Sequence, residues 1–328
     1  MARVTSVDVA RRAGVSQSTV SLVLGGKAAG RISKGTVAAV EQAAAELGYR
    51  PNAAARTLRT GRTATVGLVV PDVTNPFFGR LLRGAQDEAR RHGLTVALVD
   101  AANDPERGRS GLDALRTAAV DGYLTFEVAD ADVRRLDAPT VAIESWGAPV
   151  PRVRLDVETG VSAELEHLLA LGHRRFGRLA SAFGTDTFRA REERVRRHLA
   201  GAGLDATALP RVETTFDLDD ARRNAHALLD QAPTAVLCDD DVLASGVMLA
   251  LRERGLRAPE DVSVAGFDDL DLARVLDLTT VRVDGGALGA AAVSALVALL
   301  GGATPPDETV VPVELVVRGS TGPPPQSR

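Results

Sequence analysis

Carboxylate and amide side chains gather where apolar runs of the sequence end. The runs alternate with helical segments, a pattern typical of parallel strands, whose carboxyl ends meet at one edge of a sheet. The side chains at these ends are Asp72, Asn75, Asp100, Asn103, Glu144, Asp239, Asp240, Asp241, Asp268 and Asp269. Carboxylate and amide oxygens accept hydrogen bonds from hydroxyl groups. These residues therefore predict a polar cleft that binds a small hydroxylated molecule.

Some polar and aromatic residues have a simpler interpretation, which the sequence leaves open. Asp239–Asp241 and Asp268–Asp269 could cap the helices expected after their strands without touching a ligand. A divalent cation at Asp239–Asp241 is less favoured, because three consecutive side chains at a strand end diverge. Trp146, the only tryptophan, could be a ligand platform or a packed loop residue. His167 and His173 are expected to cap or pack, since no convincing set of metal ligands accompanies them.

The sequence lacks the motifs of common nucleotide and cofactor enzymes. It contains no GxxxxGK[ST] phosphate loop, no GxGxxG after an apolar run and no GxSxG nucleophile elbow. The nearest approach, Asp284–Gly289, has aspartate where the first glycine should make the tight turn. A single cysteine, Cys238, can form neither an internal disulfide nor, by itself, a structural zinc site. We therefore expect no enzymatic activity, no cofactor and no metal.

Charge is distributed unevenly along the chain. Residues 1–62 hold ten basic and three acidic side chains, whereas the remainder holds 29 basic and 40 acidic ones. The net charge of −4 for the whole chain conceals this difference. A basic segment of this kind suggests binding to the phosphate backbone of nucleic acid. A solvated positive surface is the alternative interpretation.

Composition places the chain among ordinary globular proteins. Of its 328 residues, 45% are hydrophobic and 25% are charged, which argues against disordered and fibrous classes. No apolar run reaches the roughly 18 to 20 residues that span a bilayer, and residues 1–14 contain no apolar signal-peptide core. The sequence thus predicts a cytoplasmic protein without membrane association.

The basic segment contains three helical patterns. Thr5 has the position of an N-cap for a first helix that ends near Gly14, where glycine permits a tight turn. Ser16 is the expected N-cap of a second helix over residues 17–24, and a third helix begins near Ser33. Two short helices joined by a glycine turn and braced by a third form a helix-turn-helix. The second helix of this motif lies in the major groove of DNA.

The same segment resembles the DNA-binding headpiece of the lactose-repressor (LacI) family of bacterial transcription factors. The matching stretches are Val4–Ala10, Ala13–Ser16, Ser18–Leu24 and Gly48–Ala53. The resemblance implies that three residues of the second helix read base edges: Gln17, Ser18 and Leu22. Gln17 and Ser18 can form hydrogen bonds there, whereas Leu22 offers only apolar contact. The resemblance also implies phosphate contacts, which set the register on the duplex, by Thr5, Ser16, Thr19 and Ser21.

The residues after the headpiece resemble the hinge helix of that family. The segment Pro51–Arg59 is helix-prone but too short to be a stable helix alone in water. In the resembling family this helix orders on DNA and enters the minor groove together with its dimer mate. Leu58 matches the leucine that wedges between central base pairs, and Ala55 matches a small residue that permits close approach. Asn52 is the third minor-groove residue implied; packing of Leu58 on the rest of the chain is the alternative.

From residue 65 onward, apolar runs and helical segments form two series. The strands expected in the first series are 66–70, 94–99, 122–126 and 140–143, with helices at 79–91 and near 108–119. The strands expected in the second are 176–180, 211–216, 235–238, 262–267 and 280–283. The fold class is therefore α/β: a three-helix headpiece and hinge helix, then two doubly wound parallel-sheet lobes. Ligands of such sheets bind at the carboxyl ends of the strands, which here face the cleft between the lobes.

The two lobes look like the periplasmic-binding-protein-like effector domain of the same family. The matching stretches are Pro71–Phe78, His167–Arg174, Cys238–Asp241 and Ser263–Asp269. The resemblance implies that Arg191 clamps the effector and that Asp268 opposes it across the pocket. Arg189 stays an open alternative, because the Gly-Phe pair expected after the arginine is replaced by Arg194-Val195.

The resemblance also assigns the remaining effector contacts. It places Asp240 on ligand hydroxyl groups and an aromatic ring, Phe216, against a sugar ring, with Phe77 or Phe78 lining the other lobe. Glu144-Ser145-Trp146 stands where the family commonly has an Asp-Arg pair. This departure suggests that the ligand chemistry differs from that of the better-known sugar regulators.

These expectations combine into a transcriptional regulator controlled by a small molecule, with repression as the family default. The expected parts are a headpiece (1–50), a hinge helix (51–61), an effector-binding and dimerisation domain (62–320) and a flexible tail (321–328). A pseudopalindromic operator in double-stranded DNA requires at least a dimer, and the tail has no leucine heptad for a tetramer, which predicts a homodimer. The effector is expected to be a sugar or a related metabolite. A solute-binding protein for a transporter is the alternative, disfavoured by the basic headpiece and by the absence of an export signal.

Overall fold

The computed structural model describes residues 4–26, 28–49 and 61–326. The chain divides between Thr63 and Ala64 into two compact units, each of which is described by itself. Three residues with an expected minor-groove role, Asn52, Ala55 and Leu58, lie outside the described residues. Among the described residues, no helix has both the length and the apolar character needed to cross a membrane.

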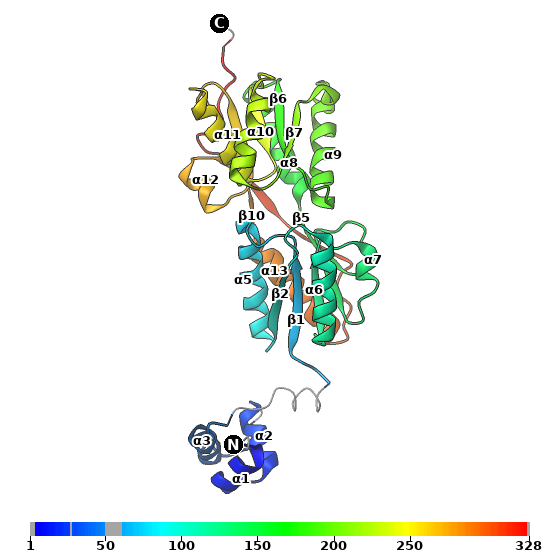
Figure 1. Ribbon diagram of the computed structural model, residues 1–328, viewed down its shortest axis with the longest axis vertical. Coiled ribbons are helices and arrows are strands. Elements are labelled where there is room, and N and C mark those ends of the chain that lie inside the picture. The colour runs from blue at the N-terminus through cyan, green and yellow to red at the C-terminus, as the bar shows by residue number, and fades with distance from the viewer. Residues whose placement is uncertain (1–3, 27, 50–60, 327–328) are drawn as a thin grey trace. The chain divides into compact units, whose positions relative to one another are not determined.

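The described residues of the first unit form three helices (Figure 1), which are α1 (Ser6–Ala13), α2 (Gln17–Leu24) and α3 (Lys34–Glu46). Their expected N-caps are confirmed. Thr5 precedes α1, and Ser16 accepts the Thr19 N–H of α2 at 3.1 Å. The third helix, expected to begin near Ser33, begins at Lys34 with Ser33 as its cap. Gly14 adopts a φ of 68° between α1 and α2, a left-handed conformation that glycine adopts without steric cost. The helix-turn-helix is therefore present as predicted.

The core of the first unit is small and built from short side chains. Val9, Val20 and Val40, one from each helix, are fully buried at its centre. Val7, on another side of α1, is 46% exposed. Because so little apolar surface is buried, this unit has little stability to spare.

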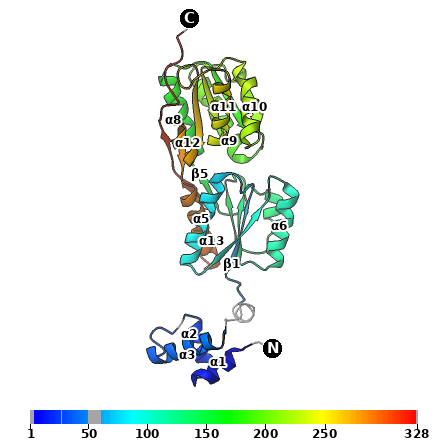
Figure 2. The ribbon, with the colours of Figure 1, turned by 60° about the vertical axis from the view of Figure 1, so that its left-hand side comes forward.

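The first lobe of the second unit is a six-stranded parallel sheet with the order β11-β5-β4-β3-β1-β2. Its strands are β1 (Thr65–Val70), β2 (Thr95–Asp100), β3 (Gly122–Phe126), β4 (Thr140–Ile143), β5 (Arg152–Leu155) and β11 (Glu308–Val311). Helices α5 (Pro76–Arg91) and α13 (Gly285–Leu300) cover one face, α6 (Pro105–Thr117) covers the other (Figure 2), and α7 (Asp130–Val133) is a single turn. Layers on both faces explain why most of these strands are apolar on both sides.

The second lobe repeats this architecture with the order β12-β10-β9-β8-β6-β7, in which only β12 is antiparallel. Its strands are β6 (Phe176–Ser181), β7 (Arg211–Thr214), β8 (Ala235–Cys238), β9 (Ser263–Asp268), β10 (Thr279–Val283) and β12 (Val313–Val316). Its helices are α8 (Val157–Ala170), α9 (Asp186–Gly201), α10 (Leu218–Leu229), α11 (Asp241–Glu253) and α12 (Asp271–Val275). Two doubly wound lobes were predicted, and two are present.

The chain passes between the lobes three times, at residues 155–157, 283–285 and 311–313. After the second passage the chain returns from the second lobe to the first. It forms α13 there, beside α5 (Figure 1). The third gives one C-terminal strand to each sheet, β11 and β12. Short connections of this kind let two lobes move as bodies around a ligand.

The boundaries of two helices and the start of the tail differ from expectation. Helices α5 and α6 begin at Pro76 and Pro105, three residues before the predicted starts, because proline is well suited to the first helical position after an Asn or Asp cap. Thr321 and Gly322, predicted as part of a flexible tail, are held by hydrogen bonds from the second lobe. His167 and His173 provide two of these bonds, which confirms their packing role.

The contact between α5 and α13 leads to a prediction about stability. A Cβ atom at Gly289 would lie 2.2 Å from the Leu81 carbonyl oxygen, so Gly289→Ala forces the two helix backbones apart. We expect this substitution to lower the free energy of unfolding by about 2 kcal/mol. Gly79→Ala is the matched control, since Gly79 is exposed on α5 with open space around it. The control is expected to gain up to about 1 kcal/mol, and calorimetric melts in which both variants shift alike would contradict the packing assigned to this contact.

Candidate functional site

A cleft lies between the two lobes, with about 630 Å³ of empty space that is partly open to solvent. It is lined by all nine residues that the sequence assigned to an effector site: Asp72, Asn75, Phe77, Phe78, Glu144, Arg191, Phe216, Asp240 and Asp268. Most of the polar ones follow the carboxyl ends of β1, β4, β8 and β9. The rule for parallel sheets thus brings together residues that are up to about two hundred positions apart in the sequence.

Arg191 projects from α9 into the cleft, whereas Arg189 does not. The Arg191 side chain is 6% exposed, and its Nη1 donates to the Asp239 carbonyl oxygen at 2.8 Å. Its guanidinium lies 3.6 Å from the centre of the Phe267 ring, and no hydrogen-bond partner for its Nε is found among the described residues. Arg189 is exposed and binds Asp186 and the Gly184 carbonyl. The geometry therefore favours Arg191 as the residue that meets a ligand.

The three consecutive aspartates after β8 point to three different sets of partners. Asp239 pairs with Arg178 at 2.6 Å, and Asp241 accepts the Thr280 hydroxyl at 2.6 Å. Asp240 Oδ1 caps α11 by accepting the Leu243 N–H at 2.7 Å. Its Oδ2 accepts the side-chain amide of Asn75, which belongs to the other lobe, at 3.2 Å. Asp240 is therefore both a helix cap and a contact across the cleft.

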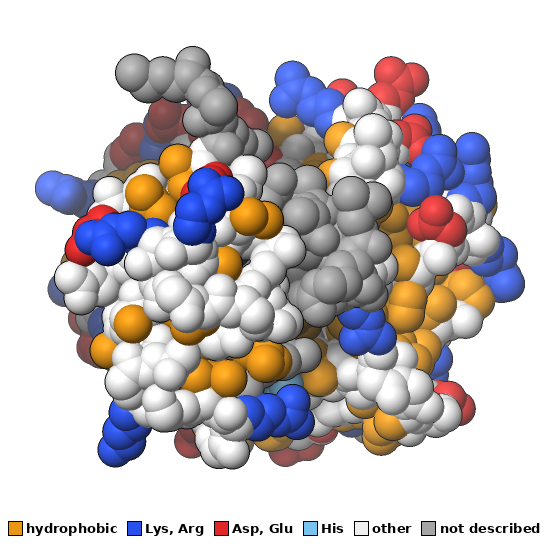
Figure 3. Space-filling model, turned by 90° about the horizontal axis from the view of Figure 1, so that it is seen from below, with side chains coloured by type: hydrophobic (Ala, Val, Ile, Leu, Met, Phe, Trp, Pro, Cys, Tyr) orange, Lys and Arg blue, Asp and Glu red, His pale blue; other side chains and the backbone are white. Residues whose placement is uncertain are grey.

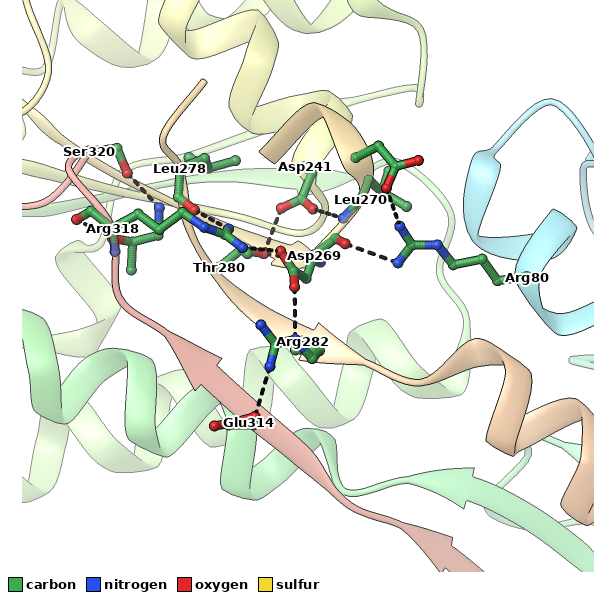
Figure 4. Close-up of polar contacts among 12 residues, drawn as sticks. Arg80, Asp241, Asp269, Leu270, Leu278, Thr280, Arg282, Glu314, Arg318 and Ser320 are labelled. Carbon is green, nitrogen blue, oxygen red and sulfur yellow. Dashed lines mark hydrogen bonds and ion pairs between the residues drawn. The ribbon is translucent and has the colours of Figure 1, made fainter. Parts of the chain in front are cut away.

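Asp268 ends β9, and an ion-pair network around the next residue, Asp269, holds the turn there in place (Figure 4). Asp268 and Asp269 have φ angles of 106° and 49°, which non-glycine residues rarely adopt. The Asp269 carboxylate accepts hydrogen bonds from Arg282 Nε at 2.8 Å and Arg318 Nη2 at 2.5 Å. From the first lobe, Arg80 on α5 donates to the Asp269 carbonyl at 2.9 Å. This network fixes the turn and links it to the facing lobe.

The interpretation of Asp268–Asp269 as a helix cap is wrong. The residue that precedes α12 is Leu270, and no side chain caps that helix. Asp269 instead forms ion pairs with the arginines of β10 and of the segment after β12. Asp268 remains in the cleft, 8% exposed.

A second glutamate, Glu127, joins Glu144 in the first lobe. The two residues follow β3 and β4, whose last residues Phe126 and Ile143 are paired in the sheet. Both have left-handed backbone, with φ of 50° and 55°, a conformation that non-glycine residues keep only where the surroundings enforce it. Glu144 Oε1 accepts the Leu155 N–H at 2.5 Å, and Glu127 Oε1 accepts the Thr187 N–H of the other lobe at 3.4 Å.

Burial changes the acidity of the carboxyl groups in the cleft. It raises the pKa of Glu127 to about 8, with a contribution from the nearby Glu144, and the pKa of Glu144 to about 7. It also raises the pKa of Asp240 to about 7 and that of Asp268 well above its usual range. Desolvation disfavours the charged carboxylate, and Arg191 opposes this effect at Glu144, Asp240 and Asp268.

Aromatic rings line both walls of the cleft. On the first lobe, Phe77, Phe78 and Phe126 meet edge to face, with ring centres 5.0 to 6.0 Å apart. On the second lobe, Phe216 lies 5.9 Å from Phe183 and 5.6 Å from Phe188. Flat apolar walls with polar groups between them suit a small ring-shaped ligand.

Several residues of the cleft were not predicted, and the structure decides between the two interpretations of Trp146. The missed residues include Glu127, Phe126, Phe183, Thr185, Thr187 and Phe188. Glu127 directly follows the predicted strand 122–126, so the rule that selected Glu144 would have found it. Trp146 is not among the lining residues; its backbone N–H donates to Asp186 at 3.0 Å, and Arg154 lies over its ring. It packs where the two lobes meet.

In the first unit, the predicted base-reading residues lie at the surface of α2. Gln17 and Ser18 are exposed at its N-terminus, and Leu22 is half-buried. The side-chain amide of Gln17 donates to the Ser6 hydroxyl at 2.9 Å, and the Ser18 hydroxyl lies 2.7 Å from that of Ser16. These contacts orient both side chains within the helix-turn-helix.

Three of the predicted phosphate contacts, Thr5, Ser16 and Thr19, lie near the N-termini of α1 and α2, and Ser21 lies in the middle of α2. Thr5 and Ser16 are the N-caps, Thr19 is half-buried and Ser21 is exposed. A helix N-terminus has unpaired N–H groups and partial positive charge, both of which favour a phosphate. Capping and phosphate contact are thus compatible at Thr5 and Ser16.

The basic side chains of the first unit are partly neutralised. Arg11 lies 3.6 Å from Asp8, and Arg12 lies 2.6 Å from Glu46. In Figure 3, lysine and arginine side chains are dispersed among acidic, uncharged and apolar ones. Both members of each pair are largely exposed, so these surface pairs are weak and can exchange for phosphate contacts.

Comparisons with protein-family models match both units. Residues 6–52 match the model described as bacterial regulatory proteins, lacI family. Residues 165–321 match the model of a periplasmic binding protein-like domain. The first match covers the helix-turn-helix, and the second covers most of the second lobe and the C-terminal strands.

Individual relatives match over almost the whole chain. The chain is 30% identical over 331 residues to the HTH-type transcriptional repressor CytR of Escherichia coli (strain K12), covering 97% of this chain and 96% of CytR. It is 33% identical to the ribose operon repressor of Halalkalibacterium halodurans, covering 96% of each chain. Among solved structures, the lac repressor dimer bound to operator and the anti-inducer ONPF superposes with a TM-score of 0.87 at 28% identity, over 98% of this chain and 100% of that one.

Proposed function

The chain belongs to the LacI family of bacterial regulatory proteins, and we propose that it represses transcription from an operator whose affinity depends on a small molecule in the cleft. The carrying observation is that one chain joins an exposed helix-turn-helix to a two-lobed cleft lined by every predicted effector residue. A solute-binding protein for a transporter would use the cleft but has no use for the helix-turn-helix. In this proposal the protein acts on chromosomal DNA in the cytoplasm and catalyses no reaction.

The contacts between the lobes supply a way for the ligand to act. Asn75 binds Asp240, and Arg80 binds both the Asp269 carbonyl and Asp271 across the cleft. A ligand that contacts both lobes favours the arrangement in which these bonds form. Such a shift can change operator affinity by a coupling free energy of about 1 to 3 kcal/mol.

The operator and the assembly follow from the helix-turn-helix. A single headpiece buries little surface on DNA, so specific binding requires two copies on a pseudopalindromic site. A homodimer is therefore the expected active form. For the effector, the polar strand ends and the aromatic walls support a carbohydrate-like metabolite.

The test is retention of genomic DNA by the purified full chain at moderate salt, in competition with random fragments. Specific binding is typically at least about a thousandfold tighter than nonspecific binding, so a small set of fragments should be retained. Residues 64–328, tested in parallel, should retain none of them. If the full chain showed no preference for any fragment, the proposal would be wrong.

Substitution of Gln17 or Ser18 is expected to change which operator bases matter. Each side chain is placed at the N-terminus of α2, where hydrogen bonds to base edges discriminate by about 1 to 3 kcal/mol. Gln17→Ala and Ser18→Ala should each relax preference at different positions when binding is selected from a randomised operator. Gln42→Ala, an exposed residue of α3 that binds Glu46, is the control and should leave the motif unchanged. An unchanged motif in all three variants would remove Gln17 and Ser18 from base reading.

A further inference from the structure

We propose that the ligand of the cleft is an organic cation, a protonated amine that also carries hydroxyl groups, rather than a neutral sugar. The inference rests on the proposed function, because it assigns a chemical class to the effector of the same cleft. Three independent features of the cleft support it: its charge, its unpartnered polar atoms and its aromatic walls.

The charge of the cleft is strongly unbalanced. Among the described residues that line it, Arg191 is the only basic one, and the acidic ones are Asp72, Glu127, Glu144, Asp239, Asp240 and Asp268. One of these, Asp239, pairs with a base outside the cleft, Arg178, and a second, Asp72, accepts the amide of Asn103, another residue of the cleft, at 3.0 Å. The other four remain, two from each lobe, and face a single guanidinium.

Buried polar atoms in the cleft lack partners. Glu144 is 1% exposed, and no hydrogen-bond partner for its Oε2 is found within the described chain. The same holds for the Arg191 Nε, which belongs to a cleft-lining side chain that is 6% exposed. The Thr187 hydroxyl is the one side-chain hydroxyl that lowers the pKa of Glu144 by hydrogen bonding, and it leaves the carboxyl group without a countercharge of its own. Buried groups of this kind are costly unless something pairs with them. An ammonium group would donate to the glutamate, and a ligand hydroxyl group would accept from the arginine.

The aromatic walls also suit a cation. Six of the chain's eight phenylalanines line the cleft, three from each lobe: Phe77, Phe78, Phe126, Phe183, Phe188 and Phe216. The faces of aromatic rings attract ammonium groups, and cages of such rings recognise amine ligands. A neutral sugar would also stack on these rings, so the excess of carboxylates distinguishes the two ligand classes.

A neutral ligand would leave most of these carboxyl groups without a countercharge. Glu127 faces Glu144 and Asp186, and Glu144 faces Arg154 and Arg191. In the other lobe, Asp240 faces Asp239, Asp241 and Arg191, while Asp268 faces Arg191, Arg80 and the aspartates 240 and 241. Without a bound cation, the group lowers its charge by holding protons, as the raised pKa values of Glu127, Glu144 and Asp240 indicate.

This linkage gives the two ligand classes opposite pH dependence. In the free protein these carboxyl groups hold more protons folded than unfolded, so their contribution to stability falls as pH rises from about 4.5 to about 8. A bound cation favours the ionised carboxylates, so amine affinity increases over the upper part of that range. A neutral ligand that accepts hydrogen bonds from protonated carboxyl groups would bind less tightly as pH rises.

The test compares matched pairs of compounds on the full chain by thermal shift and calorimetry. The amines are D-glucosamine, D-galactosamine and 1-amino-1-deoxy-D-glucitol, and their neutral counterparts are D-glucose, D-galactose and D-glucitol. We expect at least one amine to bind at least about tenfold more tightly than its counterpart, which is about 1.4 kcal/mol. The affinity of 1-amino-1-deoxy-D-glucitol, whose alkylammonium group stays charged over this range, should rise between about pH 6 and about pH 8.

Two variants assign the preference to the carboxyl groups. Glu144→Gln should reduce the amine preference by about tenfold or more, whereas Glu193→Gln, on the exposed side of α9, should not. Asp240→Asn keeps an N-cap for α11, because asparagine caps as well as aspartate, and should also reduce the preference. Asp240→Asn provides a second, independent measurement if Glu144→Gln disturbs folding.

Three outcomes would overturn the inference: a neutral compound that binds as tightly as its amine, a panel in which no amine binds, or a preference that survives both substitutions. Operator retention by the same preparation separates this failure from that of the proposed function. If specific DNA fragments are retained while the amines fail, only the ligand class is wrong. If no fragment is retained, the regulatory function fails independently of the amine result.

Discussion

Arg191→Ala is expected to abolish the effect of the ligand on operator binding, while operator affinity in the absence of ligand stays the same within about twofold. The side chain is buried in the cleft, and its Nε points to no protein partner among the described residues. It lies far along the chain from the helix-turn-helix, in the other compact unit. Removing a charge-assisted donor should weaken ligand binding by at least about tenfold. It should also remove the contact between the ligand and the second lobe.

Arg189→Ala is the matched control for this experiment. Arg189 lies on the same helix two residues earlier, is exposed and binds Asp186 and a backbone carbonyl outside the cleft. Its replacement should leave the response intact. Operator titrations with and without ligand, on both variants, decide the matter. If the ligand still changed operator affinity in Arg191→Ala but not in Arg189→Ala, Arg189 would be the residue that binds the ligand.

Val20→Asp is expected to have the opposite effect, with operator binding lost and ligand binding kept. Val20 is fully buried in α2 at the centre of the small core of the first unit. Burying a carboxylate without a partner costs several kcal/mol, which exceeds the stability that so small a core provides. The first unit should unfold, and specific operator affinity should drop by more than about a hundredfold.

Ala39→Asp controls for the added charge, because Ala39 is exposed on α3 of the same unit. It should leave the helical signal and most of the operator affinity in place. In both variants, the melting temperature of the second unit and its shift with ligand should match the unsubstituted chain. Loss of ligand binding in Val20→Asp would show that the two units do not fold independently.

Much of the fold could be predicted because it depends on local rules. The caps at Thr5 and Ser16 and the glycine turn at Gly14 are signals of a few residues each, and all are confirmed. Buried parallel strands have continuous apolar sequences, which is why nine of the twelve strands found in the described part of the chain were identified. The polar residues that follow them could then be placed in one cleft without any knowledge of distances.

The three strands that were missed are held by partners distant in the sequence. β5 carries arginines at two of its four positions, and both pair with Glu308 of the neighbouring β11, at 2.8 and 3.0 Å. β12 lies antiparallel at an edge and has glutamate beside its apolar residues. Short charged segments give no periodic signal, and their strand conformation depends on the sheet that they join.

The cleft shows the same division between local and distant causes. Glu144, Asp240 and Asp268 were found because each ends an apolar run, and Glu127 could have been found in that way. Phe183 lies in the loop between β6 and α9, and Phe188 lies in the first turn of α9. Neither follows a strand directly, so only the packing of the lobes brings them to the cleft. The Arg80 contacts to Asp269 and Asp271 join helices of different lobes, almost two hundred residues apart, and no sequence spacing predicts them.

The central claim is that a ligand between the lobes controls binding to DNA by the helix-turn-helix. The most direct measurement is the operator dissociation constant of the full chain, with and without a saturating amount of the amine that gives the largest thermal shift. The operator is the fragment retained most strongly from genomic DNA. The account predicts a change of about 5- to 150-fold in either direction. A dissociation constant that is unchanged at saturating ligand would contradict it.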